Sequence, residues 1–275
     1  SGTSLMGSLL SNHPDLHYVV EPRLTWRYGN DGKSDALTAA DANETVRTYI
    51  RDNFAARVRT AGKSRLLEKT PSNSLRPGFV EAVLPGALYL HVIRDGVGSV
   101  LSIAENWRRD AVGVHKGDPT SERGTRLPER LEELSWTRRV RYAPEFARRI
   151  APRWAWPVIG RPLWGPRLPG LAAMARRLDP LEIASKQWSA CVETAATFGR
   201  ALGSDRYFEL RLEELTPELL NSILDFCRLS RHPDVLGYFE EVYSPAVPGA
   251  RQPPGAADLE RIRGLIVPTM RLLGY

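Results

Sequence analysis

Cysteine is scarce in this sequence. The 275 residues include only Cys191 and Cys227, and each lies in an apolar pattern with helical spacing, SACVETAATF and ILDFCRL. At such a position a small buried thiol is a more frequent finding than a disulfide or a metal ligand. Two cysteines exclude a disulfide-rich secreted scaffold, and a cytoplasmic location fits this composition best.

Long hydrophobic runs are missing as well. No segment approaches the roughly 20 apolar residues that a membrane-spanning helix needs. The printed residues contain no cleavable signal, although a missing N-terminus could have carried one. Charged residues make up 25% of the chain and hydrophobic residues 42%, which is an ordinary globular composition. We therefore expect a soluble protein with a single domain over residues 1–275.

Negative charge is in the minority. The chain has 38 Lys and Arg against 32 Asp and Glu, a net charge of +6. Much of the excess falls in one stretch, which contains Arg138, Arg139, Arg141, Arg148, Arg149, Arg153, Arg161, Arg167, Arg176 and Arg177. A basic balance fits a nucleic acid, an acidic membrane surface or a small polyanion held in a cleft, and composition does not choose among them.

Apolar runs alternate with helical patterns along the chain. The runs predict strands at 17–20, 64–68, 87–93 and 206–210. The spacing of apolar residues and the capping residues predict helices at 41–61, 79–84, 96 onward, 179–202 and 216–229. This alternation predicts an α/β fold with a parallel sheet between two helical layers, and it places ligands at the carboxyl ends of the strands. Residues 106–178, rich in Arg, Trp and Pro, break the alternation, and we interpret them as an elaboration over that edge.

The opening residues, SGTS, could hold an anion. Backbone NH groups around Gly2 and Thr3, with the hydroxyls of Thr3 and Ser4, can bind phosphate oxygens where a loop becomes a helix. The plainer alternative is a capped helix. The stretch lacks the lysine of G-x-x-x-x-G-K-[ST], and no acidic strand end suggests a magnesium partner, so an ATP-type P-loop is disfavoured.

A second anion site is indicated by HVIRDGVGSVLS. Arg94 falls at the end of the most apolar strand, and Ser102 lies on the helix that follows. Both can point at the same edge of the sheet. The alternative is a surface pair between Arg94 and Asp95, with the serines of the helix facing water.

An acid and a lysine follow two of the short strands, Glu21 in VVEPR and Lys69 in EKTP. Taken singly, Glu21 could be an ion-pair partner of Arg23, and Lys69 could be a solvated loop residue. Together with two anion sites they suggest another role. An acid and a lysine beside a bound anhydride are what group transfer to a hydroxyl needs.

The ordered set SGTSLMGSLLSNHPDL…EPR, EKTP, HVIRDGVGSVLS, RYFELRLEEL and the closing LLGY resembles the sulfotransferases that use 3′-phosphoadenosine 5′-phosphosulfate (PAPS). The bacterial branch and the tyrosylprotein sulfotransferases look most similar. The resemblance covers nearly the whole chain except 106–178. It implies a P-loop-like three-layer α/β/α fold with a central parallel sheet, and PAPS as the sulfuryl donor without a metal.

The resemblance also implies roles for individual residues. The 5′-phosphosulfate loop of the family corresponds to Ser1, Gly2, Thr3 and Ser4, and its 3′-phosphate site to Arg94 and Ser102. Glu21 stands where the tyrosylprotein branch has its catalytic base, and Lys69 matches a lysine that steadies the leaving phosphate. Other members use a histidine a little after that lysine, where this chain has Pro71 and Ser72, and this departure favours Glu21.

In the family, an apolar strand and a basic residue stand immediately before the SGT loop. Neither is in the printed sequence. We therefore expect this sequence to be an N-terminally shortened version of a longer protein whose first strand is missing here, and we expect it to be a poor enzyme as printed.

The acceptor implied by this chemistry bears a hydroxyl, as a glycan, a lipid, another small molecule or a peptide tyrosine does. The region of Trp154, Trp156 and Trp164 could stack on a sugar or aromatic acceptor, lie on a lipid surface as a peripheral contact, or fold as a plain helical lid. The alternatives for the whole protein are a P-loop kinase-like phosphotransferase and a basic nucleic-acid-binding protein. Nucleic acid is disfavoured because the strongest polar signals lie at strand ends.

Overall fold

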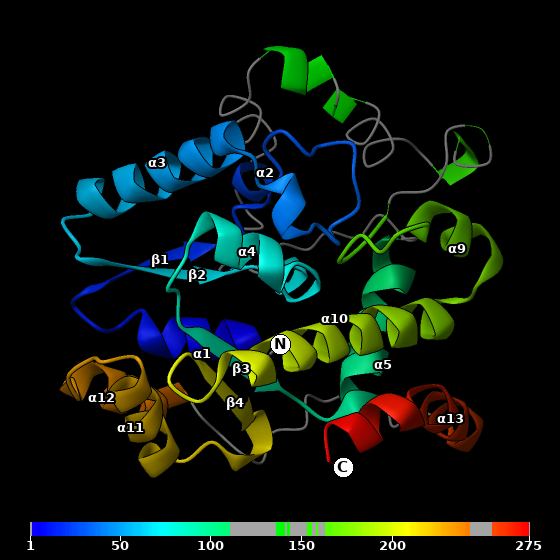
Figure 1. The fold of residues 1–275 in the computed structure, drawn as a ribbon. Coiled ribbons are helices and arrows are strands. Elements are labelled where there is room, and N and C mark those ends of the chain that lie inside the picture. Colours follow the sequence, from blue (N-terminus) through cyan, green and yellow to red (C-terminus); the bar gives the residue numbers. More distant parts are fainter. Residues whose placement is uncertain are drawn as a thin grey trace.

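The computed structural model describes residues 2–110, 136–140, 142–143, 153–155, 158, 163–242 and 255–274. In the first half of the chain the main elements are α1 (Gly2–Leu10), β1 (Leu16–Val20), α2 (Arg23–Trp26), α3 (Glu44–Thr60), β2 (Arg65–Lys69), α4 (Pro77–Val83), β3 (Tyr89–Ile93) and α5 (Gly96–Asp110). In the second half they are α9 (Leu171–Arg177), α10 (Pro180–Leu202), β4 (Tyr207–Arg211), α11 (Pro217–Phe226), α12 (Pro233–Val242) and α13 (Ala256–Leu272). The expected α/β alternation is confirmed (Figure 1).

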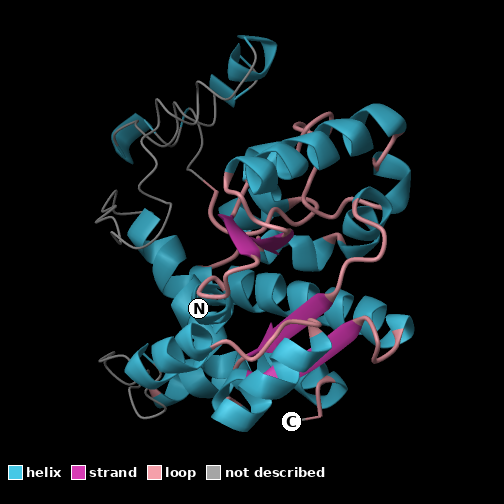
Figure 2. Cartoon of the chain, turned by 90° about the vertical axis from the view of Figure 1, so that its left-hand side faces the viewer, coloured by secondary structure: helices cyan, strands magenta, loops and turns pink. Residues whose placement is uncertain are grey.

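The four described strands are parallel, as the crossover helices between them require. β1 pairs with β2 so that Leu16 is opposite Arg65 and Val20 is opposite Lys69. β3 pairs with β4, beginning with Tyr89 opposite Tyr207. Within the described part of the chain these are two separate two-stranded sheets, seen as two pairs of arrows in Figure 2.

One helical layer serves both strand pairs. A single buried cluster joins Leu9 of α1, Leu16 of β1, Leu210 of β4 and Ile223 of α11, with Phe239 of α12 at its edge. In Figure 1, α1, α11 and α12 lie below β1 and β2, and α1 contacts both β2 and β3. The two strand pairs therefore pack against the same hydrophobic cluster.

On their opposite faces the two strand pairs pack against different helices. Val19 of β1 packs in a buried cluster with Ile50 of α3 and Phe79 of α4. Ile93 of β3 packs instead with Trp188 of α10, in a cluster that α5 and α13 complete. Both pairs therefore have helices on both faces, which is the arrangement that a parallel sheet needs to bury its two apolar sides.

Close approach of α1 to the strands depends on Gly7. A Cβ built on this residue would lie 2.1 Å from the hydroxyl oxygen of Tyr18 on β1, a distance that no side chain can accept. The missing side chain lets the helix lie flat on the strand. The start of α1 is thereby fixed relative to β1.

The long helix α10 begins as its capping residues predict. The Asp179 side chain accepts hydrogen bonds from the amides of Leu181 and Glu182, and the Glu182 carboxylate accepts one from the Asp179 amide. The prediction of free thiols is also confirmed, because neither Cys191 nor Cys227 forms a disulfide; Cys227 is buried and Cys191 is partly buried. Burial raises the pKa of Cys191 to about 12 and that of Cys227 to about 11.

Parts of the arginine-rich elaboration are tied to the loop that follows α2. Arg138 donates two hydrogen bonds to the Asp31 carboxylate, at 3.0 and 2.6 Å, and Tyr142 donates one to the same group at 2.6 Å. The Arg167 amide donates to Asp35 at 2.8 Å. These contacts hold Arg138, Tyr142 and Arg167 against that loop.

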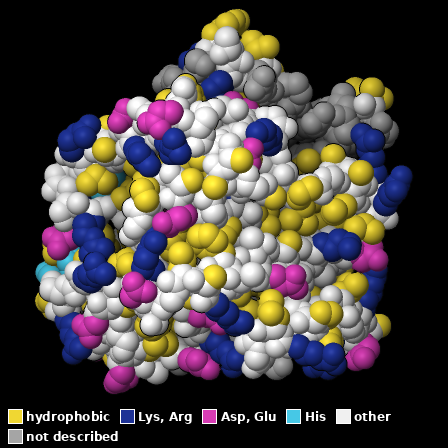
Figure 3. All heavy atoms as spheres, in the orientation of Figure 1, with side chains coloured by type: hydrophobic (Ala, Val, Ile, Leu, Met, Phe, Trp, Pro, Cys, Tyr) yellow, Lys and Arg dark blue, Asp and Glu magenta, His cyan; other side chains and the backbone are white. Residues whose placement is uncertain are grey.

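Figure 3 shows Lys and Arg side chains scattered among acidic and hydrophobic ones over the described surface of this face. None of the helices in the described ranges is long and apolar enough to span a bilayer.

Candidate functional site

The carboxyl ends of β1 and β2 bring an acid and a lysine together. Because Val20 is opposite Lys69, Glu21 is the first residue beyond the pairing, and its amide donates to the Lys69 carbonyl at 2.8 Å. The Lys69 ammonium lies 3.0 Å from Glu21 Oε1 and also donates to Ser4 Oγ at 3.2 Å. With side chains only 12% and 10% exposed, Lys69 and Glu21 form a largely buried pair.

The backbone at Glu21 is strained. Its φ is +47°, and among the described residues only Arg228 shares a positive φ without being glycine. A non-glycine residue in this region costs about 1–3 kcal/mol and persists only where the surroundings hold it. The turn is held by Arg23, whose amide donates to the Glu21 carbonyl at 2.6 Å. Strain of this kind is frequent at functional sites.

Arg23 also contacts the carboxylate itself. Its guanidinium donates to Glu21 Oε2 at 2.7 Å, while Lys69 donates to Oε1. Each carboxylate oxygen of Glu21 therefore accepts a hydrogen bond from a cationic side chain. The Arg23 side chain is far more exposed than the other two, so it closes the site on the solvent side.

The start of α1 lies against this pair. Gly2, Thr3 and Ser4 form the first turn of the helix rather than a loop before it, and Ser1 lies outside the described residues. The first NH groups of a helix have no partner within the helix, and α1 has no acidic residue in its first turn to compete for an anion. Ser4 reaches Lys69, so the helix start and the lysine face the same space.

The other predicted anion site consists of Arg94 and Ser102. No hydrogen bond or ion pair joins either of them to Ser4, Glu21 or Lys69 within the described ranges. Arg94 follows β3 and is half-buried, and Ser102 is half-buried on α5. The structure thus assembles the start of α1 with the ends of β1 and β2, and it leaves the second predicted anion site at the end of β3.

The surface pair considered for Arg94 does not form. The Asp95 carboxylate accepts a hydrogen bond from the Gly98 amide, at the start of α5, and the Asp95 amide donates to Glu213 at 2.8 Å. Among the described residues the Arg94 guanidinium has no ion-pair or hydrogen-bond partner. A half-buried guanidinium without such a partner is a ready anion ligand.

A buried network beneath the site escaped the sequence analysis. Glu68 accepts hydrogen bonds from Trp26 at 2.9 Å, Thr70 at 2.5 Å and Asn73 at 2.9 Å. Burial nonetheless raises the pKa of Glu68. Arg76 donates to Asn73 at 2.8 Å, and burial lowers its pKa to about 10. The network joins α2, which follows Glu21, to the turn that follows Lys69. It therefore holds the two segments next to the site together.

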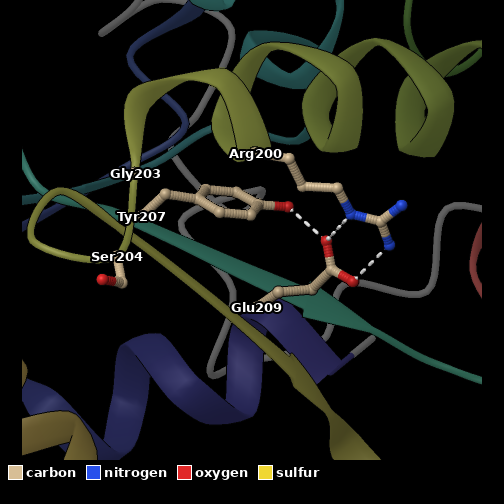
Figure 4. A pocket seen from close by; sticks show the side chains of 5 residues that line it. All are labelled: Arg200, Gly203, Ser204, Tyr207 and Glu209. Atoms are coloured by element: carbon tan, nitrogen blue, oxygen red, sulfur yellow. Dashed lines mark hydrogen bonds and ion pairs between the residues drawn. The ribbon is translucent and has the colours of Figure 1, made fainter.

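An open depression of about 290 Å³ lies elsewhere, at the amino-terminal end of β4 (Figure 4). It is lined by Arg200, Gly203, Ser204, Tyr207 and Glu209. The predicted anion sites follow the carboxyl ends of strands, so this depression lies at the other end of β4. It contains none of the residues singled out above.

The polar groups at this depression are satisfied by one another. Arg200 donates to both oxygens of Glu209, at 3.2 and 2.7 Å, and the Tyr207 hydroxyl donates to Glu209 at 2.6 Å. Because that hydroxyl proton is committed, His91 Nδ1, 2.6 Å from the Tyr207 oxygen, is the donor in their contact. His91 Nδ1 also lies 3.8 Å from Glu209 Oε2, and its proximity is the largest cause that lowers the pKa of Glu209. His91 is thus a histidine whose Nδ1 is satisfied by the Tyr207 oxygen.

A family model described as "Sulfotransferase family" matches residues 1–154, more than half of the chain. The matched range includes Ser4, Glu21, Lys69, Arg94 and Ser102. No curated protein matches.

Proposed function

The chain belongs to the sulfotransferase family, and from that premise we propose that it moves a sulfuryl group from PAPS to an acceptor hydroxyl, with Glu21 as the base. The observation that carries the proposal is the contact of one buried lysine with both a carboxylate and the start of a helix. Lys69 lies 3.0 Å from Glu21 and 3.2 Å from Ser4.

The donor site fits a phosphosulfate on physical grounds. The first turn of α1 offers backbone NH groups and the positive end of a helix dipole, and Lys69 adds a full positive charge from β2. When bound, PAPS supplies the sulfuryl group and a nucleotide leaving group. Gly2, Thr3 and Ser4 would hold its 5′-phosphosulfate, and Arg94 with Ser102 its 3′-phosphate. The Arg94 guanidinium, which has no hydrogen-bond or ion-pair partner in the described part of the chain, supports that assignment.

Each residue then has a defined task. Lys69 stabilises the negative charge that develops on the bridging oxygen as its bond to sulfur breaks, and the new bond forms from sulfur to the acceptor oxygen. Glu21 takes the proton that the acceptor hydroxyl loses. Because the transferred group carries less charge than a terminal phosphate, NH groups and one lysine suffice for it without a metal. Among the described residues, no cluster of His, Cys, Asp and Glu fits a metal ion.

We also propose that the two strand pairs are parts of one P-loop-like three-layer arrangement. Support comes from the layer of α1, α11 and α12 that both pairs share, and from the separate helices on their other faces. In this arrangement the space at the start of α1 lies between the pairs. Such a position at a switch between strands is where open parallel sheets bind ligands.

Binding of adenosine 3′,5′-bisphosphate tests the donor site. We expect this nucleotide to raise the melting temperature of the protein without magnesium. Lys69→Met should weaken binding by roughly 10- to 100-fold, because a hydrogen bond to a charged group contributes about 1.5–3 kcal/mol. Lys186→Met, which removes an exposed lysine of α10, is the matched control and should bind as the wild type does. Unchanged affinity in Lys69→Met would refute the site, and magnesium-dependent turnover of ATP would favour a kinase.

A further inference from the structure

Four large apolar side chains of the elaboration stand in solvent. Trp136 is 75% exposed, Val140 58%, Trp154 81% and Val158 88%. No other large hydrophobic side chain in the described ranges exceeds 45%. Trp136 and Val140 are four positions apart on one helical stretch, the spacing that places two side chains on one face of a helix. Exposed apolar side chains at this density mark an interaction surface.

The exposure of Trp136 and Val140 is built into the fold. They lie on the same short helical stretch as Arg138, whose side chain is buried and binds the Asp31 carboxylate at 2.6 Å. Arg138 also lies over the ring of Tyr28, with its central carbon 5.5 Å from the ring centroid. Anchoring one side of the stretch in this way turns its apolar side outward.

The same anchor lies next to the proposed acceptor side of the site. Arg138 donates to the carbonyl of Leu24 in α2 at 2.7 Å. α2 also carries Arg23, which binds Glu21. A binding partner that contacts Trp136 and Val140 therefore lies next to α2, the helix that flanks the proposed base.

The sequence around these side chains is basic. The segment 136–178 contains ten arginines and a single acid, Glu145. At its end Arg176 and Arg177 are exposed in the last turn of α9. In Figure 1 the described pieces of the elaboration protrude at the top and upper right of the molecule, above α9, and Figure 3 shows hydrophobic side chains protruding there.

We propose that this surface, defined by Trp136, Val140, Trp154 and Val158, docks on an anionic lipid bilayer and receives a hydroxyl-bearing acceptor from it. The acceptor part of this inference rests on the proposed function. Tryptophan rings prefer the interface between lipid and water, and arginines bind the negative headgroups. A nucleic acid would use the aromatic rings but not the two valines, because stacking needs a flat π face.

Vesicle sedimentation tests the docking. The wild type should bind vesicles of phosphatidylcholine with about one third phosphatidylglycerol, and bind pure phosphatidylcholine much more weakly. Trp136→Ser with Trp154→Ser should lose at least about tenfold in affinity for the mixed vesicles, since each ring loses an apolar contact. Leu265→Ser with Leu272→Ser, at the exposed apolar positions of α13, is the matched control and should bind like the wild type.

Three results would overturn the proposal. The first is that the wild type fails to bind the mixed vesicles, and the second is that the tryptophan variant binds them equally well. The third is that the tryptophans are needed to bind a single-stranded oligonucleotide or a second copy of the chain in place of vesicles. The melting shift caused by adenosine 3′,5′-bisphosphate, measured on the same samples, shows that the variant is folded. It also separates the docking hypothesis from the proposed donor site. Vesicle binding can fail while nucleotide binding holds, and nucleotide binding can fail while vesicle binding holds.

Discussion

Replacing Glu21 by Gln removes one negative charge and almost no volume. In the wild type Glu21 contacts Lys69 at 3.0 Å and Arg23 at 2.7 Å. The amide oxygen of Gln can still accept one hydrogen bond from either neighbour, but it cannot take a proton from a hydroxyl. We therefore expect the variant to fold, to bind the donor nucleotide and to lose turnover.

The sizes of these effects follow from the geometry. Loss of a general base lowers turnover by roughly 10²- to 10⁴-fold. At 3.0 Å and an effective dielectric constant near 20, the gross attraction between Lys69 and Glu21 is about 5 kcal/mol, and desolvation offsets much of it. We expect a net loss of about 1–3 kcal/mol, because Lys69 keeps its bond to Ser4. This loss lowers the melting temperature by roughly 2–10 °C.

The assay has two parts. Titration calorimetry with adenosine 3′,5′-bisphosphate should give affinities for Glu21→Gln and the wild type within about threefold. Release of that nucleotide from PAPS is then followed with phenols, sugars and lipid alcohols as acceptors. Glu44→Gln makes the same chemical change in an exposed pair with Arg47 and should behave as the wild type in both parts.

Normal turnover by Glu21→Gln would show that another group takes the proton, and the assignment of the base would be wrong. If the variant bound the nucleotide much more weakly, Glu21 would belong to the donor site. If Glu44→Gln lost as much activity as Glu21→Gln, the loss would reflect net charge.

Two further predictions concern stability. Gly7→Ala places a Cβ 2.1 Å from the Tyr18 hydroxyl, so we expect destabilisation by about 1–3 kcal/mol in urea unfolding; unchanged stability would mean that α1 does not lie on β1 as described. The pKa of Glu209 is lowered from its ordinary value of 4.5 by His91 and by its bonds to Arg200 and Tyr207, so its stabilising contribution is present above pH 4.5 and is lost as the pH falls below it. Melting curves of the wild type should therefore fall more steeply in acid than those of Glu209→Gln, and parallel curves would contradict this network.

Much of the secondary structure could be predicted because its signals are local. Asp179 and Glu182 cap α10 by contacts within one turn of chain, so the sequence 179–182 already contains the helix start. β1 and β2 were predicted within a residue or two because short apolar runs between polar turns are typical of strands. The pairing of the strands into two sheets depends on contacts between distant segments, and no local pattern contains that information.

The site was predictable by residue type but not by arrangement. Glu21 and Lys69 were singled out because they follow strands, yet their contact depends on the register that sets Val20 opposite Lys69. The network of Glu68 was missed because nothing in the local sequence distinguishes a buried glutamate in a strand from a solvent-exposed one. Its nearest sequence signal was its place directly before Lys69.

The central claim is that the start of α1 and the end of β2 bind one end of the donor nucleotide. A crystal structure with adenosine 3′,5′-bisphosphate tests it most directly. The account predicts the 5′-phosphate within hydrogen-bond distance of the Lys69 ammonium and the first amides of α1, and the 3′-phosphate at Arg94 and Ser102. A nucleotide bound instead at the depression of Arg200 and Glu209, or away from Lys69, would contradict it.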